Sequence, residues 1–191
     1  MIISSNFCGG NITLQSVNQT TAQLQIKPDT QSHFFQWFYF KAEAKVGDNL
    51  LFHITNAKEA SYQNGWKNYS ARASHDGSKW FTVNTTFENG ILKIQHVAKH
   101  TQTFVAYFAP FSMARHNALI ERSRLNGAHH TVLGQSVNGA NLDKLTIGKG
   151  RIPIWVIARQ HPGETMAEWW MQGFLERLLL SKDPAVEKLC Q

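Results

Sequence analysis

The chain has 191 residues, of which 42% are hydrophobic and 17% are charged, and this composition excludes an intrinsically disordered protein. Its formal net charge of +6 comes from basic residues spread along the chain; we expect this charge to serve solubility, with attraction of anionic partners as the alternative. The sequence has two distant cysteines and no signal peptide at its start, which predicts a cytoplasmic protein. It also has no apolar run of roughly 20 residues, so no membrane partner is expected.

Residues 1–109 carry a pattern of short strands separated by turns, which predicts an N-terminal all-β domain. Leu24 and Ile26 alternate with polar neighbours, and Asn89-Gly90 is a dipeptide that favours a tight hairpin turn. Further strands are predicted at Phe34–Ala44, Leu50–Thr55, Trp80–Val83, Ile91–Ile94 and Gln102–Phe108. Many short strands with closely spaced turns indicate an antiparallel β-sandwich.

Residues 110–191 show a different pattern, which predicts the beginning of an α/β domain. A helix is predicted over Phe111–Leu125, and two strands are predicted at Thr131–Val137 and Leu142–Ile147. Ile152–Ala158 is apolar on both faces, which is typical of a central strand in a sheet covered on both sides. A second helix is predicted from Met166 to about Leu180.

The start of this second helix has two features that bear on chemistry. Thr165 is followed three residues later by Glu168, the spacing of a capping box, so we interpret Glu168 as a capping residue. Just before it, His161-Pro162-Gly163-Glu164 joins the predicted strand to the helix, at the edge of an α/β sheet where ligands bind. The Pro-Gly turn lets His161 and Glu164 converge, and imidazole nitrogen and carboxylate oxygen are both zinc ligands.

Two ordinary explanations of the same pattern remain open. The spacing His-x-x-Glu is common, and such pairs are often surface residues. A glutamate near the start of a helix is also favoured by the helix dipole without any metal. The strand–turn–helix context favours the metal site over the bare spacing.

The segment Ala158–Thr165 is similar to the zinc motif of metallocarboxypeptidases, and most similar to that of their cytosolic carboxypeptidase branch. Gln36–Phe40 resembles the aromatic strand of the β-sandwich in that branch, and Tyr107–Ser112 resembles its junction with the catalytic domain. The three segments occur in the order found in the family. The resemblance implies an antiparallel β-sandwich over 1–109, followed over 110–191 by the first part of a carboxypeptidase-type α/β domain, a mixed sheet with flanking helices.

The resemblance also implies a zinc-dependent hydrolase that removes C-terminal residues from peptides or proteins. His161 and Glu164 would be two of its Zn²⁺ ligands. In such enzymes zinc lowers the pKa of a bound water, a glutamate acts as general base and an arginine stabilises the oxyanion. The positive charge suits acidic peptide tails, and trimming of glutamates is known in the resembling branch.

The family pattern is incomplete in this chain. No histidine follows Glu164, so the third zinc ligand is missing. The general base and the oxyanion arginine are expected beyond residue 191, and no residue here is assigned to either role. We therefore expect the chain to be an N-terminal part of a longer enzyme and to be inactive alone. The rest of the catalytic domain would come from the same or a separate chain.

Two other functions are weighed against this one. A non-catalytic β-sandwich that binds peptides or carbohydrates is the alternative, with Trp37, Trp66 or Trp80 as stacking platforms and core packing as their ordinary explanation. Nucleic-acid binding is not expected, because no RNA-binding signature or clustered basic helix is present. Five further histidines are interpreted as surface or hydrogen-bonded residues: His96, His100, His116, His129 and His130.

Overall fold

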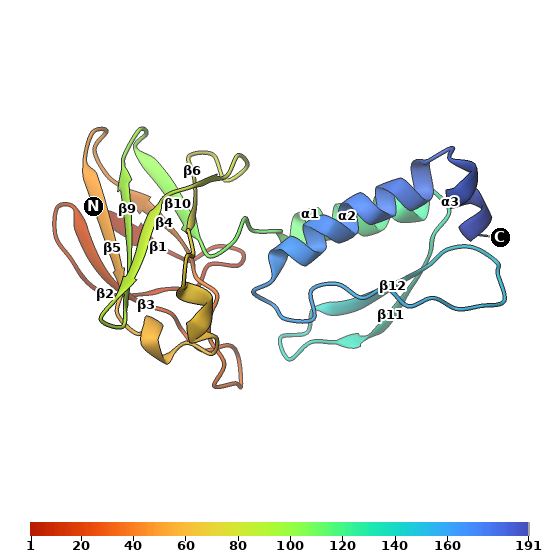
Figure 1. Cartoon of the computed structure of the whole chain (residues 1–191), viewed down its shortest axis with the longest axis horizontal. Helices are drawn as coiled ribbons and strands as arrows, with labels where there is room; N and C mark the ends of the chain where they lie inside the picture. The colour runs from red at the N-terminus through yellow and green to blue at the C-terminus, as the bar shows by residue number, and fades with distance from the viewer. Residues whose placement is uncertain (191) are drawn as a thin grey trace. The chain divides into compact units, whose positions relative to one another are not determined.

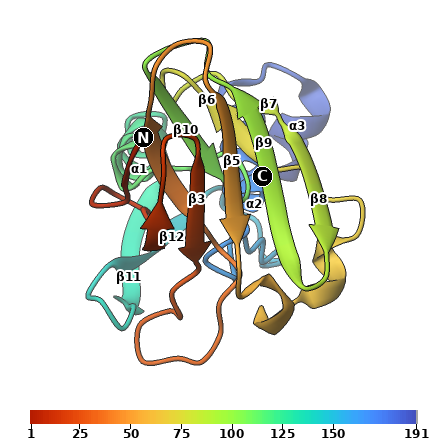
Figure 2. The same ribbon diagram turned by 90° about the vertical axis from the view of Figure 1, so that its left-hand side faces the viewer.

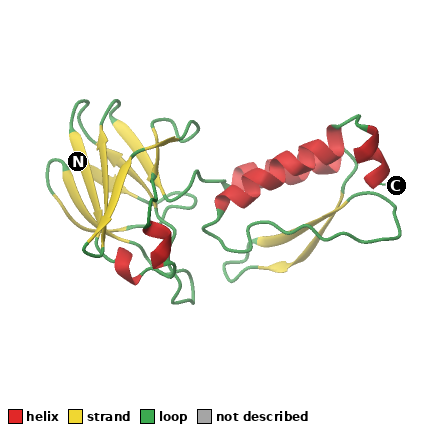
Figure 3. Ribbon diagram, in the orientation of Figure 1, coloured by secondary structure: helices red, strands yellow, loops and turns green. Residues whose placement is uncertain are grey.

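The computed structural model describes residues 1–190 and divides into two compact units, Met1–Pro110 and Phe111–Gln191 (Figure 1). The first unit is built from strands with two short 3-10 helices, and the second contains three α-helices and a strand pair (Figure 3). In the described part of the chain, no helix combines the length and the apolar character that a membrane span requires.

The first unit contains two five-stranded sheets. Sheet A has the strand order β1 (Ile2–Ser4), β4 (Tyr39–Glu43), β10 (Gln102–Ala106), β6 (Arg72–Ser74) and β7 (Phe81–Thr82). Sheet B has the order β2 (Thr13–Val17), β3 (Thr21–Gln25), β5 (Asn49–Ile54), β9 (Ile91–Val97) and β8 (Asn84–Glu88). Figure 2 looks onto sheet B, where β3, β5, β9 and β8 lie side by side. The 3-10 helices η1 (Ala57–Glu59) and η2 (Gln63–Trp66) follow β5.

One apolar core joins the two sheets. Phe52 and Ile94 of sheet B and Phe40 and Val105 of sheet A are all fully buried in the same cluster. The rings of Phe40 and Phe52 meet edge to face, with centroids 5.1 Å apart. Because alternate side chains of each sheet point into one shared layer, the unit is the β-sandwich predicted from the sequence.

One strand pair departs from the antiparallel arrangement of the rest of the sandwich. β3 and β5 are parallel, with Thr21 opposite Leu51 and Leu24 opposite Ile54, whereas every other strand pair in the two sheets is antiparallel. The reason is that β4 lies between them in sequence but belongs to the other sheet. The chain therefore crosses over and returns, and two parallel strands need such a connection.

The second unit packs its α-helices and a strand pair around a small apolar core. Its helices are α1 (Met113–Leu125), α2 (Thr165–Leu180) and α3 (Pro184–Leu189), and its strand pair is β11 (His129–Gln135) and β12 (Asn141–Thr146). α1 contacts both α2 and the strand pair. Phe111, Leu119 and Leu175 are the buried residues of the core. The observed α1, α2, β11 and β12 confirm the two helices and the two strands predicted here.

The predicted central strand at Ile152–Ala158 is not formed. The segment has no strand assignment, and Ile152, Trp155 and Ile157 are 83%, 69% and 63% exposed. A strand exists only where neighbouring strands accept and donate its backbone hydrogen bonds. Among the described residues β11 and β12 pair with each other and no strand pairs with this segment, so its apolar side chains meet solvent.

Candidate metal centre

The turn before α2 brings His161 and Glu164 together. Their side chains meet at 3.0 Å between His161 Nδ1 and Glu164 Oε2, and the turn is closed by a hydrogen bond from the Glu164 amide to the His161 carbonyl, also 3.0 Å. The two side chains are 78% and 51% exposed, so both are open to solvent. The convergence predicted from the Pro162-Gly163 turn is therefore present in the structure.

This donor pair fits a zinc ion in chemistry and in spacing. Two ligand atoms that each lie ~2.0–2.1 Å from a tetrahedral zinc ion are about 3.3 Å apart. The observed 3.0 Å between nitrogen and oxygen is close to this value, so a small rotation of either side chain would admit the ion. Within residues 1–190, however, no third His, Cys, Asp or Glu side chain completes a metal-binding group. The turn thus presents two donor atoms of the kinds that zinc binds.

Glu168 does not have the capping role predicted for it. The residue that caps α2 is Glu164, whose side chain makes no capping hydrogen bond, and Thr165 is the first residue of the helix. Glu168 lies instead on the inward face with Thr165 and Leu175, and it is 7% exposed. A buried carboxylate requires partners, and Glu168 finds them outside its own helix.

The partners of Glu168 form a chain of charged side chains. Its Oε2 accepts from Arg159 Nη1 at 2.5 Å, and its Oε1 contacts His116 Nδ1 at 2.6 Å. His116 Nε2 contacts Asp143 Oδ2 at 2.8 Å, and Asp143 Oδ1 contacts His130 Nε2 at 2.6 Å. We call Arg159, Glu168, His116, Asp143 and His130 the ionic chain. It connects the turn before α2 with α1, β11 and β12.

The geometry of the ionic chain determines the charge of His116. Both of its ring nitrogens face carboxylate oxygens, which only accept hydrogen bonds, so both nitrogens must carry protons. The hydrogen bond to Glu168, followed by the one to Asp143, raises the pKa of His116 although burial opposes this. Burial alone would raise the pKa of Glu168, but the hydrogen bonds from His116 and Arg159 lower it on balance.

Sequence reasoning missed Arg159 and Asp143, and misassigned Glu168. One signal was present: Glu168 falls on the stripe of α2 that also contains Leu175, seven residues later, and a carboxylate on an apolar stripe calls for a buried partner. The partner itself gave no signal, because His116 and Glu168 are 52 residues apart.

The other histidines mostly have the predicted roles. His116 and His130 are hydrogen-bonded, and His100 and His129 are exposed, which confirms their interpretation. The prediction is wrong for His96, which is buried and whose Nε2 has no hydrogen-bond partner among the described residues. Burial lowers the pKa of His96, which keeps its ring neutral in the core.

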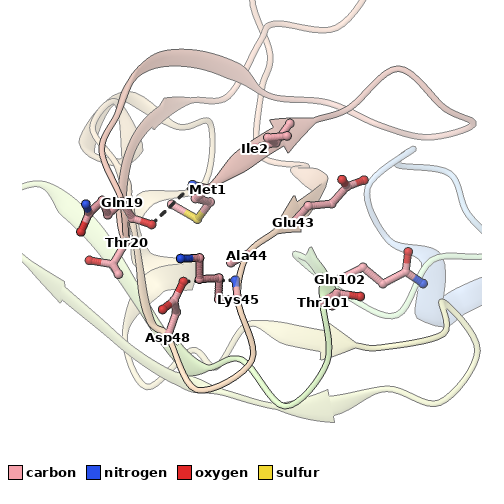
Figure 4. Close-up of a pocket in the computed structure, with 10 residues that line it drawn as sticks. All are labelled: Met1, Ile2, Gln19, Thr20, Glu43, Ala44, Lys45, Asp48, Thr101 and Gln102. Atoms are coloured by element: carbon pink, nitrogen blue, oxygen red, sulfur yellow. Dashed lines mark hydrogen bonds between the residues drawn. The ribbon is translucent and has the colours of Figure 1, made fainter.

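Each of the three tryptophans weighed as a stacking platform donates a hydrogen bond within the sandwich. Trp66 is 2% exposed, and its indole donates to the Ala57 carbonyl at 2.9 Å, so it is a core residue. Trp37 and Trp80 are half-buried, and their indoles donate to the carbonyls of Gly9 and Gly77. An open hollow of about 730 Å³ lies elsewhere in this unit, beside Met1, whose amino group contacts the Gln19 carbonyl (Figure 4). No predicted site residue lines it.

The chain matches a known protein family and known proteins in sequence. The sequence model of the cytosolic carboxypeptidase N-terminal domain matches residues 3–108. An uncharacterised protein of Zymomonas mobilis is 44% identical over 190 residues, which are 99% of this chain and 50% of that protein. The chain thus spans about half the length of this relative.

Two solved structures share the fold. A putative carboxypeptidase A from Shewanella denitrificans superposes with a TM-score of 0.94 at 39% identity, over 100% of this chain and 52% of that one. A metallo-carboxypeptidase from Burkholderia cenocepacia superposes with a TM-score of 0.91 at 37% identity, over 99% and 52%. These matches confirm the fold class predicted from the resemblance. The chain therefore belongs to the cytosolic carboxypeptidase N-terminal domain family, in the cytosolic branch of the metallocarboxypeptidases.

Proposed function

We propose that this chain is part of a zinc-dependent metallocarboxypeptidase that hydrolyses C-terminal residues of peptides or proteins. The observation that carries the proposal is the exposed meeting of His161 Nδ1 and Glu164 Oε2 at 3.0 Å in the turn before α2. Solved relatives described as carboxypeptidases, one of them as a metallo-carboxypeptidase, support the same reaction class.

In this proposal His161 and Glu164 supply two of the ligands of a catalytic zinc ion. Zinc held there would supply Lewis acidity and a bound water of lowered pKa. His161 contributes a neutral imidazole nitrogen, and Glu164 contributes a carboxylate that cancels part of the metal charge. Both residues stand at an exposed turn, which leaves the remaining positions open to further ligands and to substrate.

The remaining catalytic groups are assigned to a second half of the enzyme, in the same or a separate chain. This half would supply the third zinc ligand, the general base and the oxyanion arginine. Two observations support the assignment: the relatives are about twice as long as this chain, and Ile154, Trp155 and Ile157 are exposed apolar residues in a segment without secondary structure. Neighbouring strands would take up the backbone hydrogen bonds of this segment, and helices on the faces of the sheet would cover its side chains.

The proposed substrate is the C-terminus of a peptide or protein, and acidic tails are the preferred class because the formal net charge is +6. The name of the matching family supports a cytoplasmic location. A panel of peptides ending in Glu, Leu or Lys, offered to a protein of the relatives' full length, should show release that is fastest for Glu and is abolished by a chelator. Equal rates for all three would contradict the acidic preference.

The isolated chain 1–191 is expected to be inactive, because it supplies two of the ligands and no assigned base. In the full-length protein, His161→Gln and Glu164→Gln should each lower both zinc affinity and turnover by more than the roughly 10- to 100-fold that loss of an outer-shell partner costs, since a direct ligand of the metal is lost. His33→Gln, at an exposed position of the first unit, is the matched control and should retain both. Chelator-sensitive peptide release by the pure 191-residue chain would contradict this division of the site.

A further inference from the structure

Arg159 has a backbone conformation that its own side chain stabilises. Its φ is +53°, in the left-handed region that residues other than glycine rarely adopt. Its guanidinium donates to three oxygens: Nε to the Pro162 carbonyl at 3.2 Å, and Nη1 to the Phe111 carbonyl at 3.2 Å and to Glu168 Oε2 at 2.5 Å. One of these bonds spans the turn itself, because Pro162 lies between His161 and Glu164.

Glu168 is a fixed anchor for this arginine. It lies one helical turn after Glu164 in α2, it is 7% exposed, and both of its oxygens are occupied. His116 holds the second oxygen, and Asp143 holds the other side of the His116 ring. Rotation of the Glu168 carboxylate toward solvent would leave the half-buried His116 cation without one of its two acceptors, which is costly.

We propose that Arg159 and Glu168 are positioning residues that hold the His161–Glu164 turn in the geometry in which it meets a metal ion. This inference rests on the proposed zinc-ligand roles of His161 and Glu164. The chain of contacts runs from the packed interface of α1, β12 and α2 through Glu168 to Arg159, and from Arg159 to Pro162 at the centre of the turn. Groups that hold metal ligands in place by hydrogen bonds raise the metal affinity, because less conformational entropy is then lost when the metal binds.

A second arginine–glutamate pair in the same unit offers a matched control. Arg122 of α1 donates to Glu176 of α2 at 2.5 Å, so it also connects a guanidinium to a carboxylate of α2. Its side chains are 47% and 37% exposed, and neither has a hydrogen bond to residues 159–164. Removal of the Arg122–Glu176 pair shows how the loss of an arginine–glutamate ion pair that does not contact the turn affects the second unit.

The first part of the experiment needs no metal. Arg159→Gln, Glu168→Gln and Arg122→Gln are made in the 191-residue chain, and ¹⁵N relaxation is measured for the amides of His161, Gly163 and Glu164. In the first two variants these amides should lose the rigidity that they share with α2 and become as mobile as an exposed loop. In Arg122→Gln they should stay as in the wild type. Arg159→Gln replaces a partly exposed side chain, so it keeps the result decisive if Glu168→Gln does not fold.

The second part adds Zn²⁺ and follows the His161 ring signals by residue-resolved NMR. The apparent zinc affinity should fall 10- to 100-fold in Arg159→Gln and Glu168→Gln, the range found when groups behind metal ligands are removed. It should not change in Arg122→Gln. Arg159→Lys should recover part of the loss, since an ammonium reaches Glu168 but does not also donate to the Pro162 carbonyl.

The outcomes separate the two proposals. A turn that stays rigid in metal-free Arg159→Gln overturns the positioning role, and so does an equal loss of zinc affinity in Arg159→Gln and Arg122→Gln. A third outcome is that the turn becomes mobile in Arg159→Gln, but millimolar Zn²⁺ does not change the NMR signals of His161 in the wild type. This outcome supports the positioning role of Arg159. That result overturns the ligand role of His161 in this chain.

Discussion

At the scale of single residues, His116 is the side chain whose charge the structure determines most directly. Two carboxylates face its two ring nitrogens at 2.6 and 2.8 Å, and the histidine side chain is 21% exposed. The hydrogen bonds to Glu168 and Asp143 raise its pKa above the usual 6.5, against the effect of burial. A group that binds its proton more tightly in the folded state stabilises the fold at any pH below its unfolded pKa.

The pH dependence follows from this sign. The stabilisation by His116 should be complete below its ordinary pKa of 6.5 and should be lost as the pH rises through the raised pKa of the folded state. His116→Asn should therefore cost about 2–4 kcal/mol of unfolding free energy at about pH 6, and clearly less at about pH 9. Urea unfolding followed by the helical circular dichroism signal measures both values.

The exposed His33 provides the control, because His33→Asn should leave the unfolding free energy unchanged at either pH. A destabilisation by His116→Asn that is the same at both pH values would show that His116 is neutral in the folded state. The interpretation of the ionic chain as alternating charges would then be wrong.

Local and distant contacts differ in how far the sequence predicts them. His161 and Glu164 lie three residues apart on a Pro-Gly turn, so their contact follows from local chain geometry, and the sequence predicted it. The contact of His116 with Glu168 depends on how α1 packs on α2, and no pattern in the sequence encodes that register. For this reason the contact between the candidate ligands was predicted, and the contact between His116 and Glu168 was not.

At the scale of elements, the turn between β8 and β9 shows the strongest local constraint. Asn89 and Gly90 have φ angles of +52° and +82°, which is the tight hairpin that this dipeptide predicts. A side chain at Gly90 would also crowd Lys58, because an added Cβ would lie 2.9 Å from its Cδ. Glycine is therefore required here for both backbone and space.

Gly90→Ala should lower the unfolding free energy by about 1–2 kcal/mol, the cost of a left-handed conformation for a residue with a Cβ. Gly173→Ala is the opposite case: it is exposed within α2, nothing lies within 4 Å of an added Cβ, and it should raise helix stability by about 0.5–1 kcal/mol. Thermal unfolding of the two variants measures both shifts. Equal effects of the same sign would contradict the difference in backbone conformation.

The failed prediction at Ile152–Ala158 shows what local sequence does not determine. Helix α2 was predicted to within a residue, because its hydrogen bonds are made within the segment. The strand was predicted from an apolar run that is equally long and clear, but its hydrogen bonds require neighbours. In the described chain the segment has no strand assignment, and most of its side chains are exposed.

At the scale of the molecule, the two units differ greatly in the size of their hydrophobic cores. The first buries residues of both sheets in one large cluster, whereas the core cluster of the second has Phe111, Leu119 and Leu175 as its buried residues. The second unit also exposes Trp155 and Trp170. Because burial of apolar surface is the main stabilising contribution to folding, the two units should differ in independent stability.

Residues 1–110 alone should fold and unfold cooperatively in urea, with amide NMR signals that overlay those of the same residues in the 191-residue chain. Residues 111–191 alone should unfold at a lower urea concentration and should bind a hydrophobic dye through the exposed Ile152–Ile157 segment. If the first fragment is disordered, its core does not suffice and the division into independent units is wrong.

The position of β10 has a consequence for how the sandwich comes into being on the ribosome. β10 lies between β4 and β6 in sheet A, although it is the last strand of its unit to be synthesised. Translation proceeds from the N-terminus, so β4 and β6 emerge well before the strand that joins them. Until Ala106 has been added and released from the tunnel, the nascent chain holds two separate parts of sheet A, and the backbone edges of β4 and β6 that β10 will pair with are accessible to chaperones.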